Sequence, residues 1–179
     1  MTTEEHLIHH LMGSYYTGIV PNYYIGYWEC DVFSLNKSGY TAEYEIKLSK
    51  QDYLKDFEKA IRRWRSDNKI FKHDLIKTGQ RTNRFWFVCP EDLDVEIPKY
   101  AGLMTFVKNQ YWDRLDFTIK KKAPLLKKEK ADDKTKLQII TRLTVKHYQK
   151  ILKIEELELC QRKSTVGTVN LSIPNSESY

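Results

Sequence analysis

The sequence contains little cysteine, glycine or proline and no long apolar run. Its 179 residues include three cysteines, seven glycines and five prolines. Because Cys30, Cys89 and Cys160 lie far apart, their spacing fits neither a zinc site nor a disulfide framework, and it favours a reducing compartment such as the cytoplasm. No stretch approaches the length of about 18 apolar residues that a membrane span needs, so we expect neither a membrane span nor a secretion signal.

What the chain does contain is enough apolar material for a folded core. Hydrophobic residues make up 41% of it and aromatic residues 13%, which argues against disorder over most of the chain. The formal net charge of +6 is compatible with a nucleic-acid partner. Changes in composition predict a core domain over residues 1–119, a lysine-rich connector over 120–134, a helix over 135–164 and a tail over 165–179. The helix and the tail are candidates for contact with a second copy or with a protein partner.

Residues 28–48 carry the clearest pattern in the chain. Two predicted strands, 28–35 and 40–48, flank a polar turn that ends at Gly39, a residue suited to the positive φ of such turns. Because side chains alternate between the two faces of a strand, acids from both strands share one face with a lysine when the hairpin closes. These residues are Glu29, Asp31, Glu43, Glu45 and Lys47.

This group of charges has a chemical use. Carboxylates that converge repel one another unless a cation lies between them, and Mg²⁺ binds one or two carboxylates together with water and phosphate oxygens. A lysine beside them can position a water molecule and offset charge on a phosphate under attack. The alternative is a solvated face, on which each glutamate–lysine pair contributes roughly a few tenths of a kcal/mol. Four negative charges around one lysine favour the cation-binding interpretation.

The hairpin also carries a resemblance to a known group of enzymes. Asp31, followed by Glu45-Ile46-Lys47 on the next strand, resembles the signature of the PD-(D/E)XK nuclease superfamily. Residues 29–49, together with Lys72-His73 and residues 97–103, are similar to small bacterial and phage members of that superfamily grouped as MmcB-like DNA-repair proteins. The resemblance extends over residues 25–105 and implies a restriction-endonuclease-like α/β fold.

The same resemblance implies an activity and a cofactor. The expected reaction is hydrolysis of DNA phosphodiester bonds in DNA repair or phage DNA metabolism, in the cytoplasm of a bacterial or phage-infected cell. Mg²⁺ would be the cofactor, with Mn²⁺ as a substitute. Asp31, Glu45 and the main-chain carbonyl of Ile46 would bind the metal, and Lys47 would position the attacking water. The alternative is a catalytically inactive member of the superfamily that binds nucleic acid or protein.

A predicted N-terminal helix over residues 3–16 adds one further candidate ligand. Superfamily members often supply an extra acid from this helix, and Glu4 is the residue best placed for that role. Its alternative role is that of a first-turn acid, which the helix dipole stabilises. His6, His9 and His10 lack partners at metal-binding spacing, and we interpret them as surface residues.

The segment after the hairpin is basic. Between residues 50 and 84, eleven lysines and arginines outnumber five acids, and this surplus of six equals the net charge of the whole chain. A helix is predicted to begin after Ser49, a typical N-cap residue, and to continue to Trp64. A basic helix next to an acidic site suits a phosphodiester substrate, although such runs are also common on solvated surfaces. The candidate nucleic-acid ligands are Lys50, Lys55, Lys59, Arg62, Arg63, Lys72 and His73.

The later part of the chain completes the predicted sheet. Residues 84–89 form a nearly continuous apolar run, typical of a central strand, and residues 101–107 form another. A turn of helix at 91–93 would connect them as a parallel crossover. The predicted fold is therefore α/β, with the core order α-β-β-β-α-β, a mixed central sheet flanked by helices, an edge strand over 111–119 and a C-terminal helix.

Overall fold

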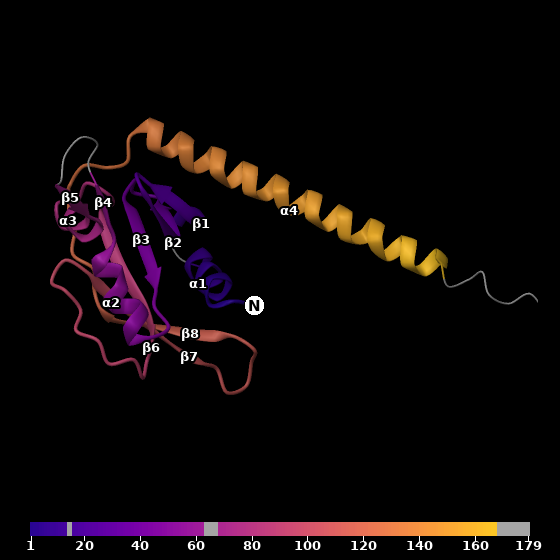
Figure 1. The fold of residues 1–179 in the computed structure, drawn as a ribbon, viewed down its shortest axis with the longest axis horizontal. Helices are drawn as coiled ribbons and strands as arrows, with labels where there is room; N and C mark the ends of the chain where they lie inside the picture. The colour runs from indigo at the N-terminus through magenta and orange to yellow at the C-terminus, as the bar shows by residue number, and fades with distance from the viewer. Residues whose placement is uncertain (14–15, 63–67, 168–179) are drawn as a thin grey trace, which may run out of the picture. The chain divides into compact units, whose positions relative to one another are not determined.

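A computed structural model of the chain describes residues 1–13, 16–62 and 68–167. The chain divides into two compact units, residues 1–139 and residues 140–179. Among the described residues, the first unit contains all of the strands and every helix except the greater part of the last one (Figure 1). The elements in chain order are α1 (Thr3–Met12), β1 (Tyr16–Ile25), β2 (Trp28–Asn36), β3 (Thr41–Ile46), α2 (Lys50–Glu58), β4 (Ala60–Arg62), β5 (Lys69–Phe71), α3 (Lys72–Lys77), β6 (Arg84–Pro90), β7 (Gly102–Lys108), β8 (Leu115–Lys121) and α4 (Asp133–Gly167).

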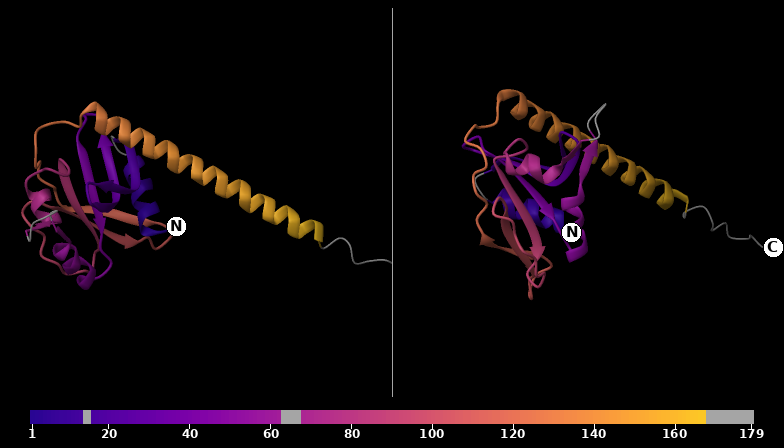
Figure 2. Two further views of the ribbon diagram at one scale, coloured as in Figure 1. Left: turned by 45° about the horizontal axis from the view of Figure 1, so that its top comes forward. Right: turned by 60° about the vertical axis from the view of Figure 1, so that its left-hand side comes forward.

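The main sheet has six strands in the order β1-β2-β3-β6-β7-β8. The pairs β3–β6 and β6–β7 are parallel and the other three pairs are antiparallel, so the sheet is mixed. The fold is α/β with flanking helices and a C-terminal helix, and the predicted order α-β-β-β-α-β is confirmed. The sheet is strongly twisted, since β3 and β8 run at a large angle to each other (Figures 1 and 2).

The hairpin of β2 and β3 forms as predicted. Gly39 has a φ of +86°, and its N–H donates to the carbonyl of Asn36 at 2.9 Å, which closes the turn. The register pairs Phe33 with Glu43 and Val32 with Tyr44. Side chains of the two strands at these paired positions therefore share a face, so the acids of both strands lie on the same side of the sheet.

Helix α2 begins where expected and ends earlier. The Ser49 hydroxyl accepts a hydrogen bond from the N–H of Asp52 at 3.1 Å, a normal N-cap. The helix ends at Glu58 because the next residues form β4, which pairs with β5 in a separate two-stranded sheet. The expected continuation to Trp64 is therefore wrong for residues 60–62, and Trp64 itself lies outside the described residues.

Three other boundaries differ from the prediction. Helix α1 ends at Met12, with Gly13 at its C-cap, and β1 begins at Tyr16. The link between β6 and β7 contains a turn and no helix, although the two strands are parallel as expected. The edge strand β8 begins at Leu115 because residues 109–114 fold into a turn in which Asn109 donates its N–H to the carbonyl of Arg114.

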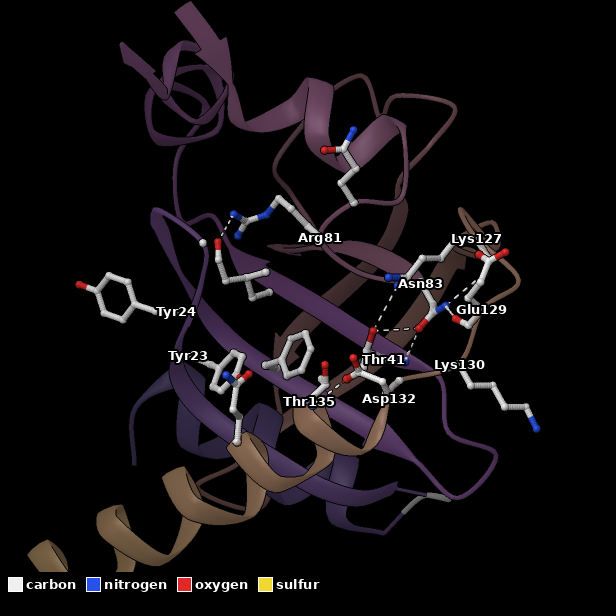
Figure 3. A pocket seen from close by; sticks show the side chains of 16 residues that line it. Tyr23, Tyr24, Thr41, Arg81, Asn83, Lys127, Glu129, Lys130, Asp132 and Thr135 are labelled. Atoms are coloured by element: carbon white, nitrogen blue, oxygen red, sulfur yellow. Dashed lines mark hydrogen bonds between the residues drawn. The ribbon is translucent and has the colours of Figure 1, made fainter. Parts of the chain in front are cut away.

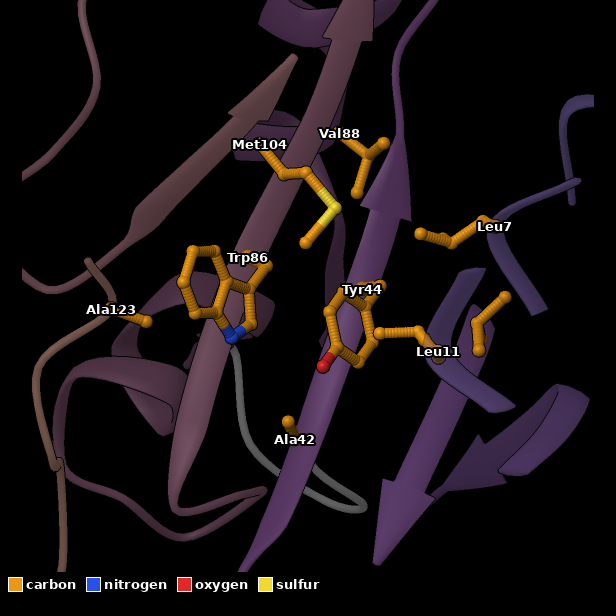
Figure 4. Close-up of a cluster of buried hydrophobic side chains, with 9 residues drawn as sticks. Leu7, Leu11, Ala42, Tyr44, Trp86, Val88, Met104 and Ala123 are labelled. Atoms are coloured by element: carbon orange, nitrogen blue, oxygen red, sulfur yellow. The ribbon is translucent and has the colours of Figure 1, made fainter. Parts of the chain in front are cut away.

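The two faces of the sheet are covered differently. Leu7 and Leu11 of α1 pack on one face against Tyr44 and Trp86, which form the centre of an apolar cluster (Figure 4). Helices α2 and α3 cover the other face, where Tyr53 and further side chains pack on Phe85 and Phe87 of β6. Because Glu43 pairs with Phe85 and Glu45 with Phe87, the acids of β3 lie on this second face, beneath the two helices.

The lysine-rich connector packs along the first unit. Asn83 donates its side-chain N–H groups to the carbonyls of Lys127 and Glu129, and Ala131 donates its N–H to the carbonyl of Gly39. Helix α4 then begins, with Asp132 accepting from the N–H of Thr135. The described helices include none that is both long and apolar enough to cross a membrane.

The second unit continues α4 from residue 140. Its described side chains, up to residue 161, include several exposed apolar groups. These are Ile140, Val145, Tyr148, Ile151, Leu152, Ile154, Leu157 and Leu159.

Candidate active site: a buried charged cluster

A cluster of charged side chains lies between the sheet and helices α2 and α3. Strand β3 and the residue that follows it contribute Glu43, Glu45 and Lys47, whose spacing of two residues places all three on one face. The remaining members come from α2, α3 and the adjoining loops. We call this group the charged cluster, and it consists of Glu43, Glu45, Lys47, Asp56, Lys59, Lys72, His73 and Arg81.

The three predicted catalytic residues are neighbours. The Nζ atom of Lys47 lies 2.9 Å from Oε2 of Glu45. Asp31, at the rim of the charged cluster, accepts a hydrogen bond of 2.6 Å from the N–H of Ile46, the residue between them. This bond joins β2 to the end of β3, and the charges of Glu45 and Lys47 act on the Asp31 carboxylate. Glu29, on the same strand, is exposed.

The cations around Glu45 were only partly expected. Its Oε1 atom accepts a hydrogen bond of 2.6 Å from Lys72, in addition to the bond from Lys47 to Oε2. Glu45 is 1% exposed, Lys47 3% and Lys72 0%. We expected the acids to need a metal ion for charge balance, and this part of the sequence interpretation is wrong. The chain supplies the missing positive charge from Lys72, 27 residues beyond Glu45.

Glu43 shows the same kind of compensation. The Arg81 guanidinium donates to both of its carboxylate oxygens, at 2.8 and 3.1 Å, in a two-point contact. A third Arg81 nitrogen donates to the carbonyl of Ile25 at 2.7 Å. Arg81 thereby connects the charged cluster to a neighbouring cavity of about 480 Å³, whose wall also includes Tyr23 and Asn83 (Figure 3).

Asp56 is the hub of the charged cluster. Its carboxylate lies 2.7 Å from Lys59, 3.1 Å from Lys47 and 3.2 Å from Lys72, and its Oδ2 atom is 2.8 Å from Nε2 of His73. Burial by itself raises the pKa of Asp56, but the bond to His73 and the positive charges of the lysines outweigh it and hold the pKa well below its usual range. Asp56 is therefore ionised at any working pH. Sequence reasoning missed this role, although a helical spacing of three from the buried Tyr53 predicts an inward position.

Two residues predicted to bind nucleic acid are internal. Lys72 is fully buried, and His73 packs its ring on Phe57, with centroids 4.3 Å apart, while its Nδ1 atom lies 2.9 Å from the hydroxyl of Tyr100. Neither side chain is available to a phosphate backbone in this arrangement, because each is bonded within the cluster. Their assignment as surface ligands is therefore wrong.

The other predicted ligands of nucleic acid have mixed positions. Lys50, Lys55 and Arg62 are exposed. The Lys59 side chain is 39% exposed and is already bound to Asp56, so it lies at the border between the charged cluster and solvent. Arg63 lies outside the described residues.

The N-terminal helix places its polar residues elsewhere. Glu4 belongs to α1, which packs on the sheet face opposite to the charged cluster, and its carboxylate accepts hydrogen bonds of 3.3 and 3.4 Å from Asn22 of β1. His6 is buried, contrary to the expected surface position, and the His10 ring packs on Phe117 with centroids 5.0 Å apart. Burial lowers the pKa of His10.

The pKa values of Asp31, at the rim of the charged cluster, and of Lys47, at its centre, are both raised, but for different reasons. Burial, followed by the negative charge of Glu45, raises the pKa of Asp31 to about 6, although the Ile46 N–H and the two nearby lysines oppose the rise. For Lys47, burial lowers the pKa, but Glu45 and Asp56 outweigh burial and raise it above its usual value. Lys47 is thus a permanent cation, which can donate hydrogen bonds and stabilise negative charge but does not act as a base.

The site contains oxygen atoms of the kind that a hard cation binds, but lysine side chains occupy some of them. Asp31, Glu45 and the Ile46 carbonyl offer the oxygen atoms that Mg²⁺ prefers. Both oxygens of Glu45, however, are hydrogen-bonded to lysine ammonium groups. Four carboxylates, counting Asp31, already meet four cationic side chains, and a divalent ion would add repulsion. Among the described residues, no three His, Cys, Asp or Glu side chains form a metal-binding group. In this arrangement, the ammonium groups of Lys47 and Lys72 therefore occupy the Glu45 oxygens that Mg²⁺ would bind.

Comparisons with known proteins bear on the fold. Neither family models nor curated proteins give a match to this sequence. Among solved structures, the fold is similar to that of the SPO1766 protein of unknown function from Silicibacter pomeroyi, with a TM-score of 0.58 and 16% sequence identity. The match covers 85% of this chain and 88% of that one. At this level of identity the likeness supports a shared fold and carries no information about activity.

Proposed function

We propose that this chain is a nuclease of the PD-(D/E)XK type, which hydrolyses phosphodiester bonds of DNA. One observation carries the proposal. Asp31 of β2 is hydrogen-bonded to the end of β3, where Glu45 and Lys47 form an ion pair. These three residues make up the pattern that resembles the superfamily. A negative carboxylate pair beside a permanent ammonium group is a combination that activates water and stabilises a phosphate under attack.

The residues themselves suggest a division of roles. Asp31 is the more exposed of the two acids, and its carboxylate would face the substrate beside Lys47. Lys47 would donate hydrogen bonds to a phosphate oxygen or to the attacking water. Lys47 and Glu45 are buried, so the site is closed in this structure. Helices α2 and α3 would have to move away from β3 before a substrate could reach these side chains. Mg²⁺, or Mn²⁺ in its place, belongs to that opened site as a proposed cofactor held by Asp31, Glu45 and the Ile46 carbonyl.

Nucleic acid is the partner that this proposal requires, with DNA favoured over RNA. The exposed cations of α2 and β4 are available for phosphate contacts, which would make binding salt-dependent. A role in DNA repair or phage DNA metabolism, in the cytoplasm, follows from the resemblance. Association of two copies through α4 and the tail remains part of the same proposal.

The decisive test compares two substitutions on β2. Labelled single-stranded, duplex and branched DNA, and the matching RNA, are incubated with Mg²⁺ or Mn²⁺ and the wild-type chain. We expect Asp31→Asn to reduce cleavage by at least about 100-fold while DNA binding is kept. Glu29→Gln, the same chemical change two residues away at an exposed position, is the matched control and should leave cleavage unchanged. The proposal is contradicted if the wild-type chain cleaves none of these substrates, or if Asp31→Asn keeps full activity.

A non-catalytic binding module is the second candidate. It is favoured by the completeness of the charged cluster, in which the carboxylates of Glu43, Glu45 and Asp56 are buried and paired with cations of the chain. A protein of this kind would bind DNA without cutting it. Fluorescence anisotropy at increasing salt separates the two: binding with no cleavage in any metal supports this candidate, and replacing Lys50, Lys55 and Arg62 should then weaken binding.

A further inference from the structure

The hairpin of β7 and β8 ends in a turn that exposes two large aromatic side chains. Tyr111 is 86% exposed and Trp112 68%, and they are neighbours in the chain. Because most of each ring remains in water, neither side chain gains the stability that burial of a ring in the core provides. Tyrosine and tryptophan are enriched where proteins contact partners, so this pair, which we call the aromatic tip, is a candidate binding surface.

Hydrogen bonds hold the backbone of the turn in one conformation. The Asn109 side-chain oxygen accepts bonds of 2.9 Å from the N–H groups of both Tyr111 and Trp112. The Asn109 side-chain nitrogen donates to one oxygen of Asp116, and the other oxygen of Asp116 lies 3.2 Å from Nε of Arg114. The backbone N–H of Arg114 also donates to the carbonyl of Trp112 at 2.7 Å. Rings on an ordered turn lose less conformational entropy on binding than rings on a disordered segment.

The topology places the aromatic tip beyond the edge of the sheet where the candidate active site lies. Strands β3, β6 and β7 are parallel, and their register aligns Ile46 with Val88 and Val88 with Met104. Strand β3 ends at Ile46, next to Lys47, whereas β7 continues past Met104 to Lys108. The hairpin therefore extends past the edge at which β3 ends (Figure 1). A nucleic-acid strand that lies along this edge can contact both the candidate active site and the aromatic tip.

We propose that Tyr111 and Trp112 stack on unpaired bases of the nucleic-acid substrate. This inference rests on the proposed function and names its substrate class, which is single-stranded or branched DNA rather than a continuous duplex. Every base has an aromatic face, so rings of this kind hold a strand without reading its sequence. In a continuous duplex the bases stack on one another, and a ring reaches a base face only after the base has left the stack.

The charges around the aromatic tip favour bases over phosphate groups as its ligands. Residues 108–116 contain two basic and two acidic side chains, so their formal net charge is zero. Arg114 is paired with Asp116 within the turn. Phosphate contacts draw their strength from a surplus of positive charge, which this turn lacks and the exposed lysines of α2 supply. The tip and α2 therefore take different parts of the same strand.

The experiment measures binding without added metal, so that cleavage does not interfere. Labelled single-stranded DNA and the blunt duplex of the same sequence are titrated with the full-length chain, and fluorescence anisotropy gives the affinities. We expect Tyr111→Ala and Trp112→Ala each to weaken single-strand binding at least about fivefold. Trp112→Phe keeps a ring and should retain most of the affinity. Ile119 is 52% exposed on the same hairpin, so Ile119→Ala is the matched control and should leave binding unchanged.

A second signal reports stacking directly. The tryptophan emission of the wild type minus that of Trp112→Phe should be quenched by single-stranded DNA and much less by the blunt duplex. Should an alanine variant fail to fold, as judged by circular dichroism, this emission difference decides in its place. Quenching by the single strand supports the inference, and its absence overturns it.

The remaining outcomes separate this inference from the nuclease proposal. Alanine variants that bind single strands as tightly as the wild type overturn the inference, even if the wild type cleaves duplex DNA. An equal loss of affinity in Ile119→Ala also overturns it, because the contact is then a general apolar one, as with a protein partner. A wild type whose single-strand binding depends on both rings but which cleaves nothing in Mg²⁺ or Mn²⁺ supports the inference and counts against the nuclease proposal.

Discussion

The two faces of the central sheet are held together by different forces. On the face under α1, Leu11 packs against Tyr44 and its neighbours in an apolar cluster. On the face under α2 and α3, Glu43 and Glu45 of the same strand are buried among lysines and an arginine. The apolar face gains stability in proportion to the area that it buries. The second face also carries an apolar cluster around Phe85 and Phe87, and its charged part is stable only while each charge keeps its partner.

The charged cluster is the better candidate for a functional site. An apolar face tolerates substitutions of similar volume, whereas a buried group of charges is costly to maintain and gives no advantage in stability over apolar packing. Such a cluster is therefore a candidate for chemistry rather than for support. Four substitutions test this difference between the faces, and two of them, Asp56→Asn and Leu11→Ala, form a matched pair on opposite faces.

The largest effect is expected for Asp56→Asn. The change removes the charge that compensates Lys47, Lys59 and Lys72, and should lower the free energy of unfolding by about 3–5 kcal/mol at pH 7, measured by urea denaturation. Folding lowers the pKa of Asp56, so this contribution is present above its unfolded pKa of 3.8 and is lost as the pH falls. The difference between wild type and variant should shrink in acid, and a loss below about 1 kcal/mol at pH 7 would contradict the hub role.

Leu11→Ala is the counterpart on the apolar face. Leu11 is buried, and truncation leaves a cavity against Tyr44, with an expected loss of about 3 kcal/mol in the free energy of unfolding. No titrating group contributes to this loss, so it should be the same at pH 5 and pH 8 and at low and high salt. A marked dependence on either condition would show that the two faces are not independent.

Gly102→Ala should have an intermediate effect. A Cβ atom at this position would lie 2.6 Å from the Trp86 ring and 2.7 Å from the Ala123 backbone nitrogen, so strand or ring must move. We expect a loss of about 1–3 kcal/mol from overpacking, measured by thermal unfolding. Gly13→Ala is the control: its Cβ meets only His10 O at 3.6 Å, and it should change stability by less than about 0.5 kcal/mol. Equal effects of the two would contradict the tight contact at Gly102.

The smallest effect is expected for Asp31→Asn, at the rim of the charged cluster, and it should be a gain in stability rather than a loss. Folding raises the pKa of Asp31 to about 6 from 3.8, so its ionised form costs stability above pH 6 and its protonated form does not below pH 4. Asp31→Asn removes this charge and should raise the melting temperature slightly at pH 8, with no gain at pH 4. A gain of equal size at both values would show that its cause is not ionisation.

The sequence was sufficient for those parts of the fold that depend on local pattern. Alternation placed the acids of β2 and β3 on one face, and Gly39 and Ser49 marked a turn and a helix start. It did not predict β4, because three residues following a helix carry too little periodicity to compete with the helical interpretation.

The site was harder to predict for a physical reason. A lysine in a basic segment is usually solvated, and nothing local to Lys72 indicates that it is buried against acids of another strand. The pairing of Glu45 with Lys72 depends on how α3 returns over the sheet, which is a tertiary property. The proximity of Asp31, Glu45 and Lys47 could be predicted because all three lie on one hairpin. The positions of Lys59 and Lys72, which bind the buried acids from other elements, could not.

The position of Asp56 at the meeting point of several cations also has an evolutionary consequence. A change at this residue leaves Glu45 as the remaining acid that Lys47 and Lys72 share, and a change at Lys72 removes one cation from both Glu45 and Asp56. We therefore expect replacements at these positions to be accepted mainly in concert. Aligned relatives should show positions 45, 56 and 72 varying together, while the surface lysines of the neighbouring helix drift one by one.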